Sequence, residues 1–378
     1  MSSIGIDYTA AYEQGGGIGR YVRELVTALS KIDLTNQYSL FVSGASLANS
    51  FAVFPPNYVW KPTRFTPKWL ARIWHRAYIP LPVEVFTGRL ELFHATDFVL
   101  PPTLPRVPSL LTVHDLSFVR VPESASPSLK DYLDIVVPRS VYRSTHVLAD
   151  SQATKDDLVS LYSVANSKIT VLLSGVDQRF FDKISDPLLM TTRKKYAIED
   201  FPYIFSVGTV QPRKNYTRLI QSLAQLRSHG IDIHLVIAGG KGWLEHPIYK
   251  TITDTHMEDF IHFIGFVDDV DLPALYRNAV CVAFPSLYEG FGLPILEGMA
   301  CGVPVLTSNV SSLPEVAGDA AILVDPYDLD AITDGLQRLI LDSELRNSLI
   351  QKGFARARQF TWEKSARHLL SVYQTLLS

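Results

Sequence analysis

The sequence contains little cysteine: Cys281 and Cys301 are the only two among 378 residues. Two thiols in apolar surroundings cannot make a disulfide framework and are typical of buried, reduced cysteines in a cytoplasmic protein. Hydrophobic runs such as 279–284 fall far short of the roughly 20 residues that a membrane-spanning helix needs. The N-terminus lacks a basic segment followed by an apolar stretch, so we expect no secretory signal peptide. Any membrane contact should therefore be peripheral.

The sequence also lacks a large excess of positive or negative charge. The 35 Lys and Arg residues nearly balance 38 Asp and Glu residues, which gives a formal net charge of -3. Proteins that bind nucleic acid in bulk are usually basic, so this class is disfavoured. With 47% hydrophobic and 19% charged residues, the composition is that of a globular protein rather than a disordered or fibrous one. At roughly 150 residues per domain, the length predicts two or three domains.

Short apolar runs alternate with longer amphipathic stretches along the whole chain. Strands are expected at 3–7, 38–42, 91–95, 109–113, 145–149, 169–173, 203–207, 232–237, 260–264, 280–284, 303–306 and 321–324. Helices are expected at 18–32, 67–78, 127–142, 152–162, 215–228, 247–256, 272–278, 292–300, 329–341, 343–357 and 362–376. This alternation predicts an α/β protein with parallel sheets that carry helices on both faces.

The alternation of strands and helices in the first half of the chain is repeated in the second half. These two blocks predict two doubly wound domains. The stretch 176–202 mixes charges and prolines without a clear period, so we place the domains at 1–180 and 185–360. The last helix is strongly amphipathic and needs a surface to cover. Ligands of open parallel sheets bind beyond the carboxyl ends of the strands. The two domains are therefore expected to face each other across a cleft lined by the loops that follow their strands.

A glycine-rich loop follows the first predicted strand. Gly15, Gly16 and Gly17 precede a predicted helix, where the backbone can approach a ligand and the helix N-terminus favours an anion. The dinucleotide fingerprint is not met, because position 22 is Val. The loop is either a contact for phosphate or sugar, which we favour, or a flexible tight turn.

Two further loops carry charged side chains directly after predicted strands. His114 and Asp115 follow the strand at 109–113. His114 could bind a sugar hydroxyl or orient a leaving group, or the pair could be a capping Asp beside a satisfied His. No Ser or Cys nucleophile motif accompanies them, which disfavours a hydrolase triad. Arg213 and Lys214 could hold a diphosphate and neutralise it as a leaving group, unless they form only a solvated basic turn.

The most informative stretch runs from Phe284 to Pro304 and contains two carboxylates separated by seven residues. Glu289 is expected on a loop and Glu297 on the helix that follows. Carboxylates accept hydrogen bonds from paired hydroxyls, so one suits a sugar and the other a ribose. The amides at 291–293 (Phe291, Gly292 and Leu293) would point at phosphates from the helix N-terminus.

This stretch is similar to the E-x7-E motif of the retaining glycosyltransferases of family 4, which have the GT-B fold. Further segments resemble this family in the expected order: 15–19, 114–115, 149–151, 174–177, 213–214, 239–240, 263–267 and 312–315. The resemblance implies that the last helix, 361–378, crosses back onto the first domain. Thr209 stands where family members often carry Arg, and Arg213 would then do that work.

The resemblance also implies roles for individual residues. Glu289 would contact the donor sugar, Glu297 the ribose hydroxyls, and Arg213 with Lys214 the diphosphate. His114 would lie beside the reacting sugar, and Gly16 with Gly17 would shape the junction of donor and acceptor. The remaining donor-binding residues are expected to be Gly208, Val267, Gly290, Phe291, Gly292 and Leu293.

The function implied is transfer of a hexosyl group, with retention, from a nucleotide diphosphate sugar to a hydroxyl of a glycan or lipid-linked acceptor. The donor would be a UDP-hexose or GDP-mannose, and no cofactor is expected. The run 114–118 resembles mannosyl- and related hexosyltransferases of bacterial surface polysaccharides. Two alternatives stay open: a nucleotide-sugar epimerase of the same architecture, and a non-catalytic nucleotide-sugar sensor.

Two Asp-x-Asp sequences, at 269–271 and 328–330, match a short metal-binding pattern. Each precedes a predicted helix, where Asp is an ordinary residue, and such short motifs match often by chance. We therefore expect no metal site and metal-independent transfer.

The stretch 60–78 is basic and contains no acidic residue. Its basic residues are Lys61, Arg64, Lys68, Arg72, His75 and Arg76, and Trp69 and Trp74 lie among them. Lys68, Arg72 and Arg76 would share one face of a helix. Basic amphipathic segments with Trp can lie on an anionic membrane, which would suit a lipid-linked acceptor. The alternatives are a solvated helix that packs its Trp residues on the domain, or a positive acceptor groove.

Overall fold

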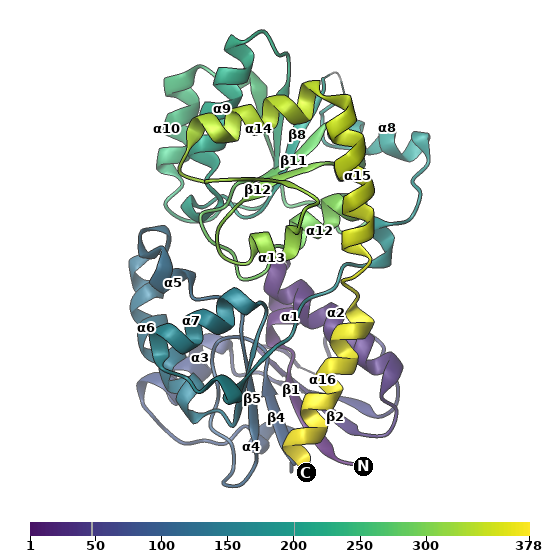
Figure 1. Cartoon of the computed structure of the whole chain (residues 1–378). Helices are drawn as coiled ribbons and strands as arrows, with labels where there is room; N and C mark the ends of the chain where they lie inside the picture. Colours follow the sequence, from purple (N-terminus) through teal and green to yellow (C-terminus); the bar gives the residue numbers. More distant parts are fainter. Residues whose placement is uncertain (47, 200) are drawn as a thin grey trace. The chain divides into compact units, whose positions relative to one another are not determined.

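The computed structural model describes residues 1–46, 48–199 and 201–378. The chain forms two compact units, each built on one parallel sheet (Figure 1). The first unit comprises Met1–Leu116, Asp131–Gly175 and Thr361–Ser378, and the second comprises Ser117–Lys130 and Val176–Phe360. The expected α/β class with two parallel sheets is confirmed.

The sheet of the first unit has seven parallel strands. Their order is β3 (Tyr58–Thr63), β2 (Gln37–Ser43), β1 (Ser3–Asp7), β4 (Leu92–Ala95), β5 (Ser109–Val113), β6 (His146–Ala149) and β7 (Ile169–Val171). The order reverses between β1 and β4. Because parallel crossovers are right-handed, strands added in opposite directions place their helices on opposite faces. Every residue of β5 is buried, as expected for a strand covered on both sides.

The helices of the first unit are α1 (Thr9–Glu13), α2 (Gly17–Ile32), α3 (Pro67–Ala71), α4 (Glu84–Thr87), α6 (Pro127–Arg143, from residue 131), α7 (Gln152–Tyr162) and α16 (Trp362–Leu377). The apolar face of α2 is buried through Val22, Leu25 and Leu29, which recur at helical spacing. Helix α16 packs against α2, and the hydroxyl of Tyr373 lies 2.7 Å from Nδ1 of His94 on β4. The amphipathic C-terminal helix thus covers the first unit.

The sheet of the second unit has six parallel strands. Their order is β10 (Ile261–Gly265), β9 (His234–Ala238), β8 (Tyr203–Val207), β11 (Cys281–Phe284), β12 (Val305–Ser308) and β13 (Ile322–Val324). The helices are α5 (Ser117–Arg120), α8 (Asp186–Lys195), α9 (Tyr216–Ser228), α10 (His246–Thr255), α11 (Leu272–Arg277), α12 (Leu293–Ala300), α13 (Leu313–Ala317), α14 (Leu329–Leu341) and α15 (Ser343–Ala357). The order reverses between β8 and β11, so the carboxyl ends of these two strands form a topological switch point. Both cysteines are free and buried, as expected.

Besides the short helices α1, α4, α5 and α13, which were not expected, the structure differs from the sequence expectations as follows. Strand β3 was not expected; it contains Pro62 and lies at the sheet edge, where a missing N–H is tolerated. Helix α8 lies in the stretch that shows no clear period. Residues 117–130 group with the second unit, in which Trp243 Nε1 donates to the carbonyl of Ser124 at 2.7 Å. The single helix expected at 67–78 is α3 followed by one π-helical turn, Arg72–Arg76.

Candidate functional site

In the second unit, the loops that follow β8 and β11 converge because these strands are paired, with Cys281 opposite Ile204. The chain after β8 forms a 3₁₀ turn, Pro212–Lys214, and enters α9 through Asn215. The side-chain amide of Asn215 donates to the carbonyls of Pro285 (3.0 Å) and Pro326 (2.7 Å). Leu287 N donates to the carbonyl of Arg213 at 2.8 Å. These bonds fix the two loops in register with each other.

Three of the predicted site residues meet here. Arg213 Nη1 lies 2.7 Å from Glu289 Oε2 and 2.8 Å from the carbonyl of Tyr288. Lys214 Nζ lies 2.7 Å from Glu289 Oε1 and 4.6 Å from the ring centroid of Phe284. The side chains of Arg213, Lys214 and Glu289 are only 16%, 11% and 9% exposed. Both cations are thus held on one carboxylate, and all three side chains are largely shielded from solvent.

The electrostatics of this cluster favour the ionised carboxylate. Burial raises the pKa of Glu289, but the charges of Arg213 and Lys214 and the hydrogen bond from Lys214 outweigh burial and lower that pKa to about 2. Two cations and one anion leave a formal charge of +1 on the cluster. Such a cluster can attract a dianionic group such as a diphosphate.

The loop that carries Glu289 is anchored by two serines from the segment after β12, which sequence reasoning did not assign to the site. Glu289 N donates to Ser311 Oγ at 3.0 Å. The hydroxyl of the buried Ser312 lies 2.9 Å from the carbonyl of Glu289 and 2.8 Å from that of Phe291. The family-like segment 312–315 is a sequence signal for Ser312, and Ser311 lies directly before it.

Helix α12 begins directly after this loop, at Leu293, and Gly292 precedes it with a φ of +112°. A Cβ there would lie 2.9 Å from Leu313 Cδ2 and 3.0 Å from Ile295 Cδ1, so both backbone angle and packing require glycine. The N–H groups at the start of a helix favour an anion. Phe291 is buried, and Gly290 precedes it in the same loop.

Glu297 lies on α12 and is 2% exposed. The hydroxyl of Tyr276, on α11, donates to its Oε2 at 2.8 Å. The other predicted donor-binding residues lie at strand ends. Gly208 follows β8, and a Cβ there would lie 2.8 Å from Lys214 Cε, so glycine leaves room for the lysine chain. Val267 follows β10 and is buried.

In the first unit, His114 follows β5 and is paired with Asp150, which follows the neighbouring strand β6. Its Nδ1 lies 2.7 Å from Asp150 Oδ2, and its Nε2 lies 2.9 Å from the carbonyl of Thr96. With Asp150 ionised, both partners accept, so both ring nitrogens donate and the ring is an imidazolium. Burial raises the pKa of Asp150, and the charge and hydrogen bond of His114 oppose this. Burial lowers the pKa of His114, but Asp150, aided by Asp97 and the carbonyl, raises it to about 9.

The glycine loop of the first unit contains glycines with two distinct roles. A Cβ at Gly16 or Gly17 would meet no atom within 4 Å, so these two positions leave open space at the start of α2. A Cβ at Gly19 would lie 2.0 Å from the carbonyl oxygen of Gln14, so Gly19 is required for the packing of α2 on the preceding turn.

The two Asp-x-Asp sequences have structural roles in the fold. Asp271 Oδ2 accepts hydrogen bonds from Lys195 Nζ at 2.5 Å and from the Tyr196 hydroxyl at 2.9 Å. Asp328 caps α14 by accepting from Ala331 N at 3.0 Å. Across the described ranges, no group of three or more His, Cys, Asp or Glu side chains is arranged to hold a metal ion.

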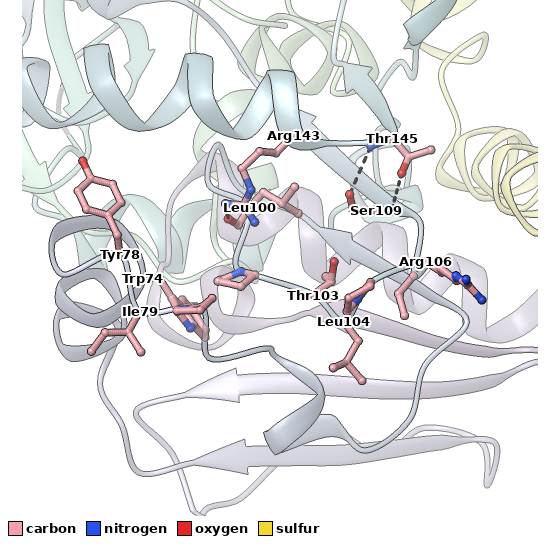
Figure 2. A pocket seen from close by; sticks show the side chains of 14 residues that line it. Trp74, Tyr78, Ile79, Leu100, Thr103, Leu104, Arg106, Ser109, Arg143 and Thr145 are labelled. Atoms are coloured by element: carbon pink, nitrogen blue, oxygen red, sulfur yellow. Dashed lines mark hydrogen bonds between the residues drawn. The ribbon is translucent and has the colours of Figure 1, made fainter.

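The first unit contains a cavity of about 510 Å³ that none of the predicted site residues lines. Ser109 and Thr145, at the amino ends of β5 and β6, line it together with Trp74 and Arg143 (Figure 2). His114 follows the opposite, carboxyl end of β5. This cavity is therefore separate from the predicted site residues of the first unit.

Two family models match the chain. One, described as Glycosyltransferase Family 4, matches residues 15–180. The other, described as Glycosyl transferases group 1, matches residues 190–356. The O-antigen chain mannosyltransferase B of Escherichia coli is 32% identical over 286 residues, which cover 75% of this chain and 74% of that protein.

Solved structures resemble the whole chain. Sucrose-phosphate synthase from Thermosynechococcus elongatus has a TM-score of 0.77 at 20% identity, and the match covers 100% of this chain and 99% of that one. Anabaena HepE in complex with UDP and glucose has a TM-score of 0.76 at 17% identity, and the match covers 99% and 100%. At these identities the likeness shows the fold.

Proposed function

Because the chain belongs to glycosyltransferase family 4 and has the GT-B fold, we propose that it transfers a hexosyl group from a nucleotide diphosphate sugar to a hydroxyl of a glycan or lipid-linked acceptor. The observation that supports this most is the placement of Arg213 and Lys214 on Glu289 at the switch point of the second sheet. This is where open α/β sheets bind ligands. The Escherichia coli relative is named an O-antigen chain mannosyltransferase, which supports a product among surface or extracellular polysaccharides.

In this proposal the second unit binds the donor. Arg has five N–H donors and Lys three, so Arg213 and Lys214 can each hold Glu289 and a phosphate oxygen together. Glu289 contacts the sugar, and Glu297 the ribose hydroxyls. The N–H groups of 291–293, at the start of α12, face the phosphates. Gly208, Gly290 and the backbone around Val267 complete the donor site.

The first unit contributes His114 and the glycine loop. Both ring nitrogens of His114 are already bonded, to Asp150 and to the carbonyl of Thr96. We propose that His114 acts as a fixed positive charge beside the reacting sugar rather than as the partner of a sugar hydroxyl. We propose that Gly16 and Gly17 shape the junction of donor and acceptor, which the open space at their Cβ positions supports.

We propose retention of configuration without a metal. The bond between the anomeric carbon and the diphosphate oxygen breaks, and the acceptor oxygen bonds to the same face of that carbon. The acceptor proton passes to the leaving phosphate oxygen. Arg213 and Lys214 stabilise the negative charge that develops on the diphosphate. No residue needs to become covalently attached to the sugar.

The donor is proposed to be GDP-mannose or a UDP-hexose. Two observations support the two options. The Escherichia coli relative is named as a mannosyltransferase, which favours mannose. The Anabaena structure with the same fold holds UDP and glucose, which favours a UDP-hexose.

The test is release of nucleoside diphosphate from GDP-mannose and from UDP-glucose in EDTA, with and without simple mannosides and glucosides as acceptors. Transfer should release UDP or GDP and give a product whose anomeric configuration, read by ¹H NMR, matches the donor. Lys214→Gln should abolish release, whereas Lys195→Gln, in an exposed ion pair, should not. An epimerase would change the sugar of the donor without releasing the diphosphate, and a sensor would change neither.

We also propose peripheral contact with the inner face of a membrane through 60–78. Among the residues that the structure places, no helix is long and apolar enough to cross a membrane. Lys68, Trp69, Arg72 and Arg76 are exposed, and Trp69 is 55% exposed. The second tryptophan of the helix, Trp74, instead packs inward against Phe41 and Phe86.

A further inference from the structure

We propose that the first unit binds one anionic lipid of the bilayer at two adjoining cavities beside the π-helical turn Arg72–Arg76. The larger, of about 510 Å³, is the cavity of Figure 2. The smaller, of about 280 Å³, lies between the π-helical turn and α6. Both are lined by Trp74, Tyr78 and Arg143. This site would serve the membrane contact proposed above and takes no part in the chemistry of transfer.

The two cavities differ in polarity, as an amphiphile requires. Carbon atoms form nearly all of the exposed wall of the smaller cavity, and Val136 lies at its buried side. The larger cavity has a mixed wall, and Arg106 and Arg143 are among the residues that line it. The Arg143 guanidinium donates to the carbonyl of Leu100, which also lines this cavity, and to that of Pro101. Figure 2 shows Trp74, Tyr78 and Ile79 on one side of the larger cavity and Arg106 on the other. The smaller cavity suits hydrocarbon, and the larger suits a phosphate headgroup.

Positive charge surrounds these cavities. Arg64, Lys68, Arg72 and Arg76 are exposed on the segment that leads to them, and Arg106, Arg139 and Arg143 are exposed around them. Arg139 lies 4.9 Å from the ring centroid of Tyr78 and donates to its hydroxyl. Each Lys or Arg near an anionic leaflet adds to the attraction, so the charge selects an anionic rather than a neutral lipid.

Apolar side chains lie exposed among these cations. Trp69, Tyr78, Ile79 and Leu104 are 55%, 58%, 51% and 44% exposed. Trp and Tyr are enriched where one end of a side chain meets lipid and the other meets water. Three segments distant in sequence, 67–80, 100–107 and 139–145, bring these groups together around the cavities. The π-helical turn turns Trp74 inward to form a wall while Trp69 stays exposed.

The volumes limit what can enter. A volume of 280 Å³ equals that of about nine waters in the liquid. The smaller cavity can therefore take a short length of one chain, and the rest of the lipid would stay in the bilayer. We infer that the lipid is held at the membrane surface and is not extracted from it.

The experiment is sedimentation of the full chain with vesicles of phosphatidylcholine alone, or of phosphatidylcholine mixed with phosphatidylglycerol, at low salt and without donor. Binding is expected only to the mixed vesicles. Arg72→Gln and Arg106→Gln should each weaken binding about fivefold, whereas Lys250→Gln, on α10 of the second unit, should not. Equal binding to both vesicle types, or equal loss with Lys250→Gln, would overturn the proposal.

Occupation of the cavities is tested with phosphatidylglycerol brominated in its acyl chains. The bromine atoms should quench the fluorescence of Trp69 and Trp74. Trp74→Phe should remove the part of the quenching that Trp74 contributes. Val136→Phe, which adds bulk at the wall of the smaller cavity, should weaken binding. Ile79→Ser, at an exposed position on the wall of the larger cavity, should also weaken binding and keeps the lipid site testable if Val136→Phe does not fold. Unchanged binding in both variants, quenching confined to other tryptophans, or full competition by inorganic phosphate would contradict a lipid site. Because no donor is present, either result leaves the transferase proposal standing.

Discussion

Replacing Glu289 by Gln removes a carboxylate that both Arg213 and Lys214 contact at 2.7 Å. The amide keeps nearly the same shape but has no charge and only one oxygen. Two poorly exposed cations would then face each other without the anion between them. We expect this change to destabilise the second unit and to abolish transfer.

The expected loss of stability follows from the lowered pKa of Glu289. The difference between the ordinary pKa of 4.5 and the value of about 2 in the fold corresponds to about 3 kcal/mol at neutral pH. Breaking a buried ion pair from one side typically costs roughly 3 to 5 kcal/mol, which agrees. Since the folded pKa is lowered, this stabilisation is present above about pH 4.5 and is lost as the pH falls toward 2.

The assay is urea unfolding of the wild type and of Glu289→Gln at pH 7, with and without UDP or GDP. The variant should lose about 3 kcal/mol, and a bound diphosphate should restore more stability to the variant than to the wild type, because its charge replaces the missing carboxylate. Glu363→Gln, which breaks an exposed pair with Arg367, is the matched control and should cost less than about 0.5 kcal/mol. A loss below about 1 kcal/mol together with retained transfer would refute this account of Glu289.

Three further outcomes are expected. Asp150→Asn should lower the pKa of His114 from about 9 toward its ordinary value, as measured by NMR of the labelled ring. In the wild type, the stabilisation from this pair should be full below about pH 6.5 and lost as the pH rises through 9. A neutral His114 at pH 7.5 in the wild type would contradict this prediction. Gly17→Ala should leave the unfolding temperature unchanged but lower the transfer rate. Gly19→Ala should destabilise the fold, because its Cβ would overlap a backbone carbonyl. Equal stability of the two variants would contradict the distinct roles of these glycines. Treatment with EDTA should leave the transfer rate unchanged, and a rate restored only by Mg²⁺ would show that a metal takes part.

The regular part of the fold could be predicted from sequence because its strands are short apolar runs between turns. β5 and β8 are examples, since each is followed by a polar loop. β3 could not be found in this way, because Pro62 and the neighbouring Lys61 hide an edge strand. The break of the helix after Ala71 into a π turn leaves no periodic signal in so short a segment.

The site could be predicted only in part. The order of strand-end loops and the family resemblance indicated Arg213, Lys214 and Glu289, but spacing along the chain could not show that one carboxylate holds both cations. The sequence likewise pairs His114 with its neighbour Asp115, whereas its ring bonds to Asp150, 36 residues away. That contact depends on β5 and β6 being adjacent strands, which local pattern does not encode.

The most direct test of the central claim, a metal-independent diphosphate site on the second unit, is a thermal-shift titration with UDP and GDP in EDTA. At one hundred times its dissociation constant, a ligand adds about 2.7 kcal/mol of stability. We predict a shift with one of the two nucleotides, reduced in Lys214→Gln and unchanged in Lys195→Gln. No shift with either nucleotide, or a shift that appears only with Mg²⁺, would contradict the account.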